Sequence, residues 1–113
     1  MVRGGGSGVL DFRVLANDVS VVNLESNNTI VPNTTIIHSC AYKTNDFYSY
    51  FNGTNPLSDT SGNLPICTRF KLGDSSVNAA SGFLNGHIAK LTYYPKRLSN
   101  TTLQILTFAE MYG

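Results

Sequence analysis

The sequence has few charged residues, and this scarcity excludes one class of partner. Charged side chains make up 13% of the 113 residues, and the formal net charge at pH 7 is +1. Surfaces that bind nucleic acid neutralise phosphates with clustered lysine and arginine. The few basic residues here form no such stripe. We therefore expect no nucleic-acid partner.

Long apolar stretches are also missing. No apolar run approaches the roughly 20 residues that a membrane-spanning helix needs. The opening MVRGGGSG contains an arginine but lacks the apolar region of a signal peptide. We expect neither a transmembrane helix nor a signal peptide, and no membrane partner.

Cysteine and histidine are too scarce to suggest a metal site. Cys40 and Cys67 lack the spacing of a metal knuckle and are too few for a disulfide scaffold. They could form one disulfide, although two reduced thiols filling small apolar sites are the preferred interpretation. His38 and His87 have no acidic or thiol partner at a recognisable ligand spacing. We expect no metal and no cofactor.

Acidic residues are scattered as well. A glycoside hydrolase presents two carboxylates together across a cleft, whereas Asp46, Asp59, Asp74 and Glu110 lie in turns or near the C-terminus. One carboxylate per loop is a weak cage for calcium, which prefers about six or more oxygens. Turn formation is the preferred role of Asp59 and Asp74. We expect no enzyme.

What the sequence does contain is Asn, Ser, Thr and Gly mixed with aromatic and β-branched residues, a composition typical of strands joined by turns. The glycine-rich residues 1–8 are predicted to be a flexible segment. Residues 9–113 are predicted to form one mostly β domain with a modest core.

Four strands are predicted in the first half of the chain. Residues 9–15 alternate, with Leu10, Phe12 and Val14 on one face. Residues 19–24 form the next strand, after a turn. Residues 34–43 have small or apolar side chains on both faces, which is typical of a central strand covered on both sides. Residues 46–51 follow, and Asn52-Gly53 then predicts a hairpin turn because both residues tolerate positive φ.

The second half is predicted to contain strands at residues 68–73 and 87–94, the latter with a bulge, and then a helix. Pro95 ends the strand because it has no N–H to donate. Ser99 is a good N-cap, and Leu98 can pack on Leu103 as a hydrophobic staple. Leu103 and Leu106 share one face of the helix, so the helix should dock on a sheet.

The segments YFNG, FKLG and GHIAKLTYYPKRLSNTTLQ, in this order, resemble the C-terminal half of a concanavalin A-like lectin/glucanase domain of the laminin-G or pentraxin kind. The stretches AYKTNDFYSYFNG and DTSGNLP make the chain similar to the versions found in bacteriophage tail and other virion structural proteins. The resemblance covers roughly residues 11–107. It implies an antiparallel β-sandwich of jelly-roll type with one short C-terminal helix.

Domains of this kind are considerably longer, and their N-terminal half supplies the opposing sheet, which this chain lacks. The resemblance therefore implies either a trimmed relative or a partial sandwich, covered by a second copy or by another virion protein. We expect a homo-oligomer, with a homotrimer preferred only slightly over other symmetric assemblies.

Two functions remain in competition. The first is a non-enzymatic structural or interaction protein of a phage virion, in the tail, a fibre or a head decoration, with contact to host-surface glycans as an additional role. The second is a carbohydrate-binding, lectin-like module of a bacterial or viral surface protein. Tyr48 and Tyr50, beside Asn45 and Asp46, are the candidate sugar contacts because sugars stack on aromatic rings. Cover of the same tyrosines by another sheet or chain is the preferred alternative.

Overall fold

The computed structural model describes residues 2–4, 9–17, 19–67 and 86–112. Strands dominate the described chain, and one short helix follows them near the C-terminus, as predicted. The elements are β1 (Val2–Gly4), β2 (Val9–Ala16), β3 (Val19–Thr29), β4 (His38–Lys43), β5 (Asp46–Phe51), β6 (Thr54–Asp59) and α1 (Asn100–Tyr112).

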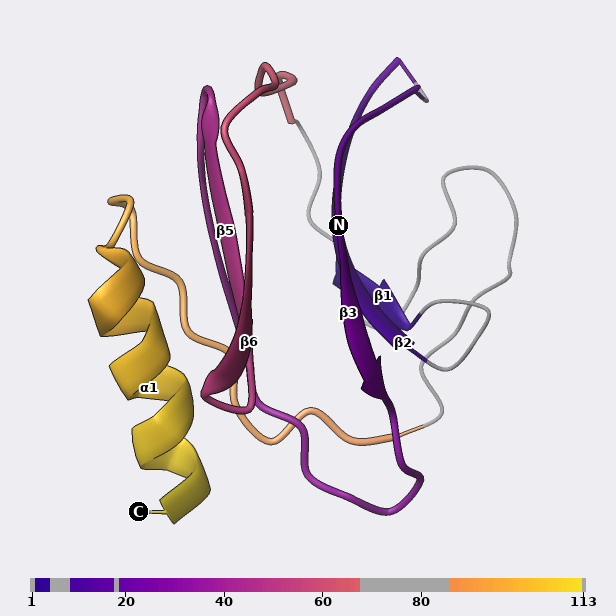
Figure 1. Ribbon diagram of the computed structural model, residues 1–113, viewed down its shortest axis with the longest axis vertical. Coiled ribbons are helices and arrows are strands. Elements are labelled where there is room, and N and C mark those ends of the chain that lie inside the picture. The colour runs from indigo at the N-terminus through magenta and orange to yellow at the C-terminus, as the bar shows by residue number, and fades with distance from the viewer. Residues whose placement is uncertain (1, 5–8, 18, 68–85, 113) are drawn as a thin grey trace.

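The strands form two antiparallel sheets, each built from consecutive strands. The first sheet has the order β1-β2-β3 and the second the order β4-β5-β6. The two sheets lie face to face, and α1 covers the far side of the second sheet, so that three layers follow one another across the molecule (Figure 1). The expectation that the chain lacks an opposing sheet is therefore wrong, because its own N-terminal strands supply one.

The strand predicted at residues 34–43 is shorter, β4 (His38–Lys43), and in the described part of the chain it lies at the edge of its sheet rather than at the centre. Within the described residues β5 is the middle strand of the second sheet, because β4 and β6 are its two hairpin partners. The small and apolar side chains on both faces of β4 have another cause. One face lies toward the first sheet and the other lies under α1.

The main core lies between the two sheets. It contains five buried side chains: Phe12, Val14, Val22, Leu24 and Phe47. Phe12 and Val14 occupy alternate positions, as the pattern of residues 9–15 predicted, whereas Leu10 lies outside the residues whose side chains are described. Each fully buried side chain of this kind contributes about 1.5 to 3 kcal/mol. These side chains therefore fix how the two sheets face each other.

A second core lies between the second sheet and α1. It contains Ala41, Tyr50 and Leu103, with Tyr48 and Leu98 packed against them. The predicted staple is confirmed, since Leu98 and Leu103 belong to the same cluster. This cluster docks the helix on the sheet.

The start of α1 is capped as predicted. The Thr102 N–H donates to Ser99 Oγ at 3.1 Å, and the Leu103 N–H donates to the Ser99 carbonyl oxygen at 3.0 Å. Further along the buried face, Thr107 Oγ1 donates to the Leu103 carbonyl oxygen at 3.2 Å. The buried hydroxyl therefore has a partner. Leu106 is only half-buried.

Two turns with left-handed residues set the shape of the second sheet. Asn52 and Gly53, with φ of 48° and 69°, reverse the chain between β5 and β6, which confirms the predicted hairpin. Asn45, with φ of 57°, lies between β4 and β5. Its N–H donates to the Gly62 carbonyl oxygen at 2.9 Å, and the Gly62 N–H donates to Asn45 Oδ1 at 3.1 Å. This pair ties the loop after β6 to the turn before β5.

Two predictions about individual segments are wrong. Residues 87–94 form no strand, and their apolar side chains are exposed. Their spacing, Ile88 then Leu91 then Tyr93, does not keep the two-residue period that lets one face of a strand be buried. Residues 2–4, predicted to be flexible, pair with β2 as strand β1. The strand predicted at residues 68–73 lies outside the described residues.

Replacing Leu103 by alanine should lower the free energy of unfolding by about 2 to 5 kcal/mol, because the change removes buried methyl groups and leaves a cavity under the helix. Chemical denaturation measures the loss. Ile105→Ala on the same helix is the matched control: Ile105 is 59% exposed, and its replacement should cost less than about 0.5 kcal/mol. Equal small losses for both variants would show that α1 is not docked.

Candidate functional site

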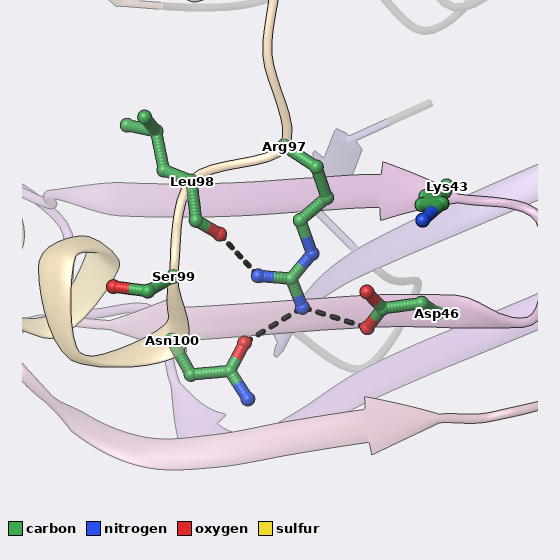
Figure 2. A pocket seen from close by; sticks show the side chains of 6 residues that line it. All are labelled: Lys43, Asp46, Arg97, Leu98, Ser99 and Asn100. Atoms are coloured by element: carbon green, nitrogen blue, oxygen red, sulfur yellow. Dashed lines mark hydrogen bonds and ion pairs between the residues drawn. The ribbon is translucent and has the colours of Figure 1, made fainter.

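A polar pocket lies where the turn between β4 and β5 meets the start of α1. Its volume is about 470 Å³. It combines two cationic side chains, one carboxylate, one amide and one hydroxyl, as Figure 2 shows. The lining residues are Lys43, Asp46, Arg97, Leu98, Ser99 and Asn100.

Arg97 organises this pocket. Its Nη2 donates to Asp46 Oδ1 at 2.8 Å and to Asn100 Oδ1 at 2.6 Å, so one nitrogen holds two side chains from different elements (Figure 2). Its Nη1 donates to the Leu98 carbonyl oxygen. The Arg97 side chain is 14% exposed, whereas that of Asp46 is 50% exposed. The ion pair therefore fastens β5 to the start of α1 and leaves part of the carboxylate open to solvent.

Tyr48 lies beneath the arginine, and Tyr50 lies beside Tyr48. The Arg97 guanidinium carbon is 6.0 Å from the centre of the Tyr48 ring, within cation–π range. The Tyr48 and Tyr50 ring centres are 5.4 Å apart. Burial raises the pKa of Tyr48, and its hydrogen bond with Tyr50 raises it further, while the positive charge of Arg97 acts in the opposite direction. Both tyrosines therefore belong to the packing between sheet and helix.

The structure separates the four predicted sugar contacts. Asp46 lines the pocket, Tyr48 lies under Arg97, and Tyr50 is buried against α1. Asn45 uses its side chain and backbone to hold Gly62. Helix α1 of the same chain covers Tyr48 and Tyr50. The sequence predicts cover by another sheet or another chain instead. Binding of sugar by these four residues stays a prediction.

Among the lining residues, sequence reasoning named only Asp46 as a site residue and missed the polar side chains of Lys43, Arg97, Ser99 and Asn100. The Arg97-Leu98-Ser99-Asn100 run was the available signal, because it places several polar side chains at the start of the predicted helix. Arg97 braces the start of the helix through its hydrogen bond to Asn100. Its strand partner could not be inferred from local sequence.

The other polar candidates have local roles. Nε2 of His38 lies 2.6 Å from Ser49 Oγ. Asp59 accepts hydrogen bonds from the hydroxyl and the N–H of Ser61, both at 2.8 Å, and these bonds lower its pKa. His87 is exposed. Asp74 lies outside the described residues, as does the side chain of Glu110.

The described residues offer neither a metal-binding group nor a membrane-spanning helix. They contain no group of three His, Cys, Asp or Glu side chains that could hold a metal ion. No helix among them has both the length and the apolar character needed to cross a membrane.

The two cysteines differ in their surroundings, and both are free thiols. Cys40 packs against the core between the sheets, and burial raises the pKa of its thiol to about 11. Cys67 is exposed, so the prediction that it fills an apolar site is wrong. It lies in the loop after β6, where its Sγ donates to the Pro65 carbonyl oxygen at 3.8 Å.

Comparisons with known proteins identify no relative. No protein-family model matches the chain. Searches of curated proteins and of solved structures also give no match. The interpretation of the site therefore rests on its own geometry.

The Arg97–Asp46 ion pair should contribute modestly to stability. A double-mutant cycle of Arg97→Ala and Asp46→Ala should give a coupling of about 0.5 to 1 kcal/mol, because half of the Asp46 side chain is in solvent. Arg97→Ala alone should cost about 1 to 3 kcal/mol, since it also removes the donors to Leu98 and Asn100. A coupling of zero in denaturation measurements would contradict the ion pair.

Cys67 should be alkylated well before Cys40. The thiolate is the reactive form, and raising the pKa of Cys40 from 9.0 to about 11 lowers its thiolate fraction at pH 8 by about 100-fold. Mass spectrometry after brief alkylation of the native protein measures both rates. Because the unfolded thiol ionises first, the stability due to Cys40 should be present below pH 9 and lost between about pH 9 and 11. Equal alkylation rates would contradict the burial of Cys40.

Proposed function

We propose that the chain is a non-enzymatic structural and interaction protein, a β-sandwich building block of a virion such as a phage tail, fibre or head decoration. The observation that carries the interaction role is the exposed stretch 88–94. Its four large apolar side chains, Ile88, Leu91, Tyr93 and Tyr94, are between 45% and 73% exposed.

Such a stretch favours an assembled state. Monomeric proteins seldom display large contiguous apolar patches, and those that do commonly bind a partner there. A formal net charge of only +1 opposes association weakly. The partner we propose is a second copy of the chain, with other virion proteins as further neighbours. A homotrimer is preferred slightly over other symmetric forms.

No missing sheet is needed to explain self-association. The second sheet is covered on both faces by the chain itself, so its strands need no outside cover. Self-association is proposed from the exposed apolar side chains of residues 88–94.

The non-enzymatic part of the proposal draws on the state of the described carboxylates. Asp46 is paired with Arg97, and Asp59 is held by Ser61. Both have structural partners, and neither has been found paired with a second carboxylate as hydrolysis requires. Turnover of a β-glucan that is lost on replacing Asp46 or Asp59 would contradict this part.

The concanavalin A-like jelly roll is also part of the proposal. The hairpin at Asn52-Gly53 and the Ser99 cap agree with the resemblance. The described strands, however, follow one another within each sheet, whereas a jelly roll alternates strands between its sheets. An experimental structure of the assembled protein tests this: interleaved strands would support the jelly roll, and two separate meanders would contradict it.

A carbohydrate-binding module is the second candidate. The pocket around Asp46 favours it, because carboxylate, amide and hydroxyl groups at a surface complement the hydroxyl groups of a sugar. The virion location rests on the resemblance alone. Mass spectrometry of purified particles tests it, and absence of the chain from them would contradict it.

We expect the purified protein to self-associate at micromolar concentrations in sedimentation experiments. Replacing Leu91 and Tyr93 together by asparagine should shift the population toward monomer, because this removes apolar surface that association would bury. Ile105→Asn, on the exposed face of α1, is the matched control and should leave the distribution unchanged. A native chain that sediments as a monomer throughout this range would contradict the proposal.

A further inference from the structure

Asp46 and Asn100 are held side by side by one atom. Arg97 Nη2 donates to Oδ1 of both residues, at 2.8 Å and 2.6 Å, so the carboxylate and the amide have a fixed relation to each other (Figure 2). They come from different elements, β5 and α1, and Arg97 has its guanidinium group largely buried. Their arrangement is therefore set before any ligand arrives.

The same contacts leave complementary groups unused. Each acidic or amide side chain has two polar ends, and Arg97 occupies only the Oδ1 end of each. Among the described residues, no hydrogen bond engages Asp46 Oδ2 or Asn100 Nδ2. Asp46 Oδ2 is an anionic hydrogen-bond acceptor, and Asn100 Nδ2 is a donor with two protons. Lys43 Nζ, from the end of β4, adds a further donor to the lining.

Hydroxyl groups complement this arrangement. A hydroxyl donates one hydrogen bond and accepts others, so the free acceptor of Asp46 and the free donor of Asn100, whose residues share Arg97 Nη2 as a partner, can engage two hydroxyls of one ligand. An anionic ligand fits less well, because Asp46 would repel it and both Nη nitrogens of Arg97 already donate to protein oxygens, while its Nε, which has no partner, is buried. An apolar ligand would bury these polar groups without partners.

We propose that Asp46 and Asn100 bind a vicinal diol of a saccharide, with Lys43 as an additional donor and Arg97 as the positioning residue. The proposal rests on the glycan-contacting role proposed above, and it moves that contact from the tyrosines to the pocket. Tyr48 then supports Arg97 from beneath, and Tyr50 packs beside Tyr48. A small, open, polar site of this kind gives affinities in the millimolar range.

Titration followed by ¹⁵N-resolved NMR tests the proposal. The probes are methyl pyranosides of glucose, mannose and galactose, together with trans-1,2-cyclohexanediol, and cyclohexanol serves as the single-hydroxyl control. Saturable shifts should appear at Lys43, Asp46 and Asn100, including the Asn100 side-chain amide, with at least one pyranoside and with the diol. Cyclohexanol should cause no saturable shift there.

Three variants locate the site. Asp46→Asn removes the anionic acceptor, and Asn100→Asp replaces the donor by an acceptor while keeping an oxygen for Arg97. Each should weaken binding by about tenfold or more, the effect of losing a hydrogen bond to a charged or preorganised group. Glu25→Gln makes the same charge change as Asp46→Asn at an exposed position of the first sheet and should leave binding unchanged. Amide spectra of all variants report whether the fold is retained.

The unfavourable outcomes are distinct. Saturable shifts confined to another surface, or affinities that fold-retaining Asp46 and Asn100 variants leave unchanged, would overturn this site while preserving a glycan-contacting role. Absence of saturable shifts anywhere would overturn both. Neither result bears on self-association, which sedimentation measures independently.

Discussion

Burial of the second sheet on both faces is the constraint on which the rest of the structure depends. Alternate side chains of β5 point to opposite sides, so Phe47 joins the core between the sheets while Tyr50 joins the core under α1. A sheet that is apolar on both sides is stable in water only between two covering layers. The first sheet and the helix provide them, and a slip of β5 by one residue would exchange the two cores.

The polar pocket is a product of this layering. The helix has to be held at its start as well as along its buried face, and Arg97 does this by joining the first turn of α1 to Asp46 of β5. The same arginine orients the side chains that line the pocket. A structural ion pair at a half-exposed position contributes little free energy, but it sets the geometry of the groups around it. Arg97 therefore both holds the helix on the sheet and positions the side chains proposed to bind a ligand.

Local sequence signals predicted those features whose physics is local. Asn52-Gly53 has the backbone freedom that its hairpin requires, and Ser99 caps the helix with its own side chain. The edge position of β4 was not predictable, because cover on both faces looks the same in sequence whether it accompanies a central strand or comes from a helix. Residues 87–94 have side chains with a high propensity for strands. Their apolar residues are spaced irregularly, however, so a strand there would have no continuous apolar face to bury, and none forms. Asp46 was predicted as a site residue, whereas Asn100 was not, since only tertiary packing brings the two together.

The helix that covers the second sheet lies far from it in sequence. Ser39 Oγ donates to the Leu103 carbonyl oxygen across a separation of 64 residues. During synthesis, both hairpins of the second sheet leave the ribosome well before α1, and the face that carries Tyr48 and Tyr50 stays uncovered meanwhile. Contacts of such long range close slowly, and exposed aromatic faces on folding intermediates promote aggregation. Because α1 covers the second sheet only late in synthesis, correct folding depends on how soon α1 docks. It also depends on any chaperone that shields the sheet until then.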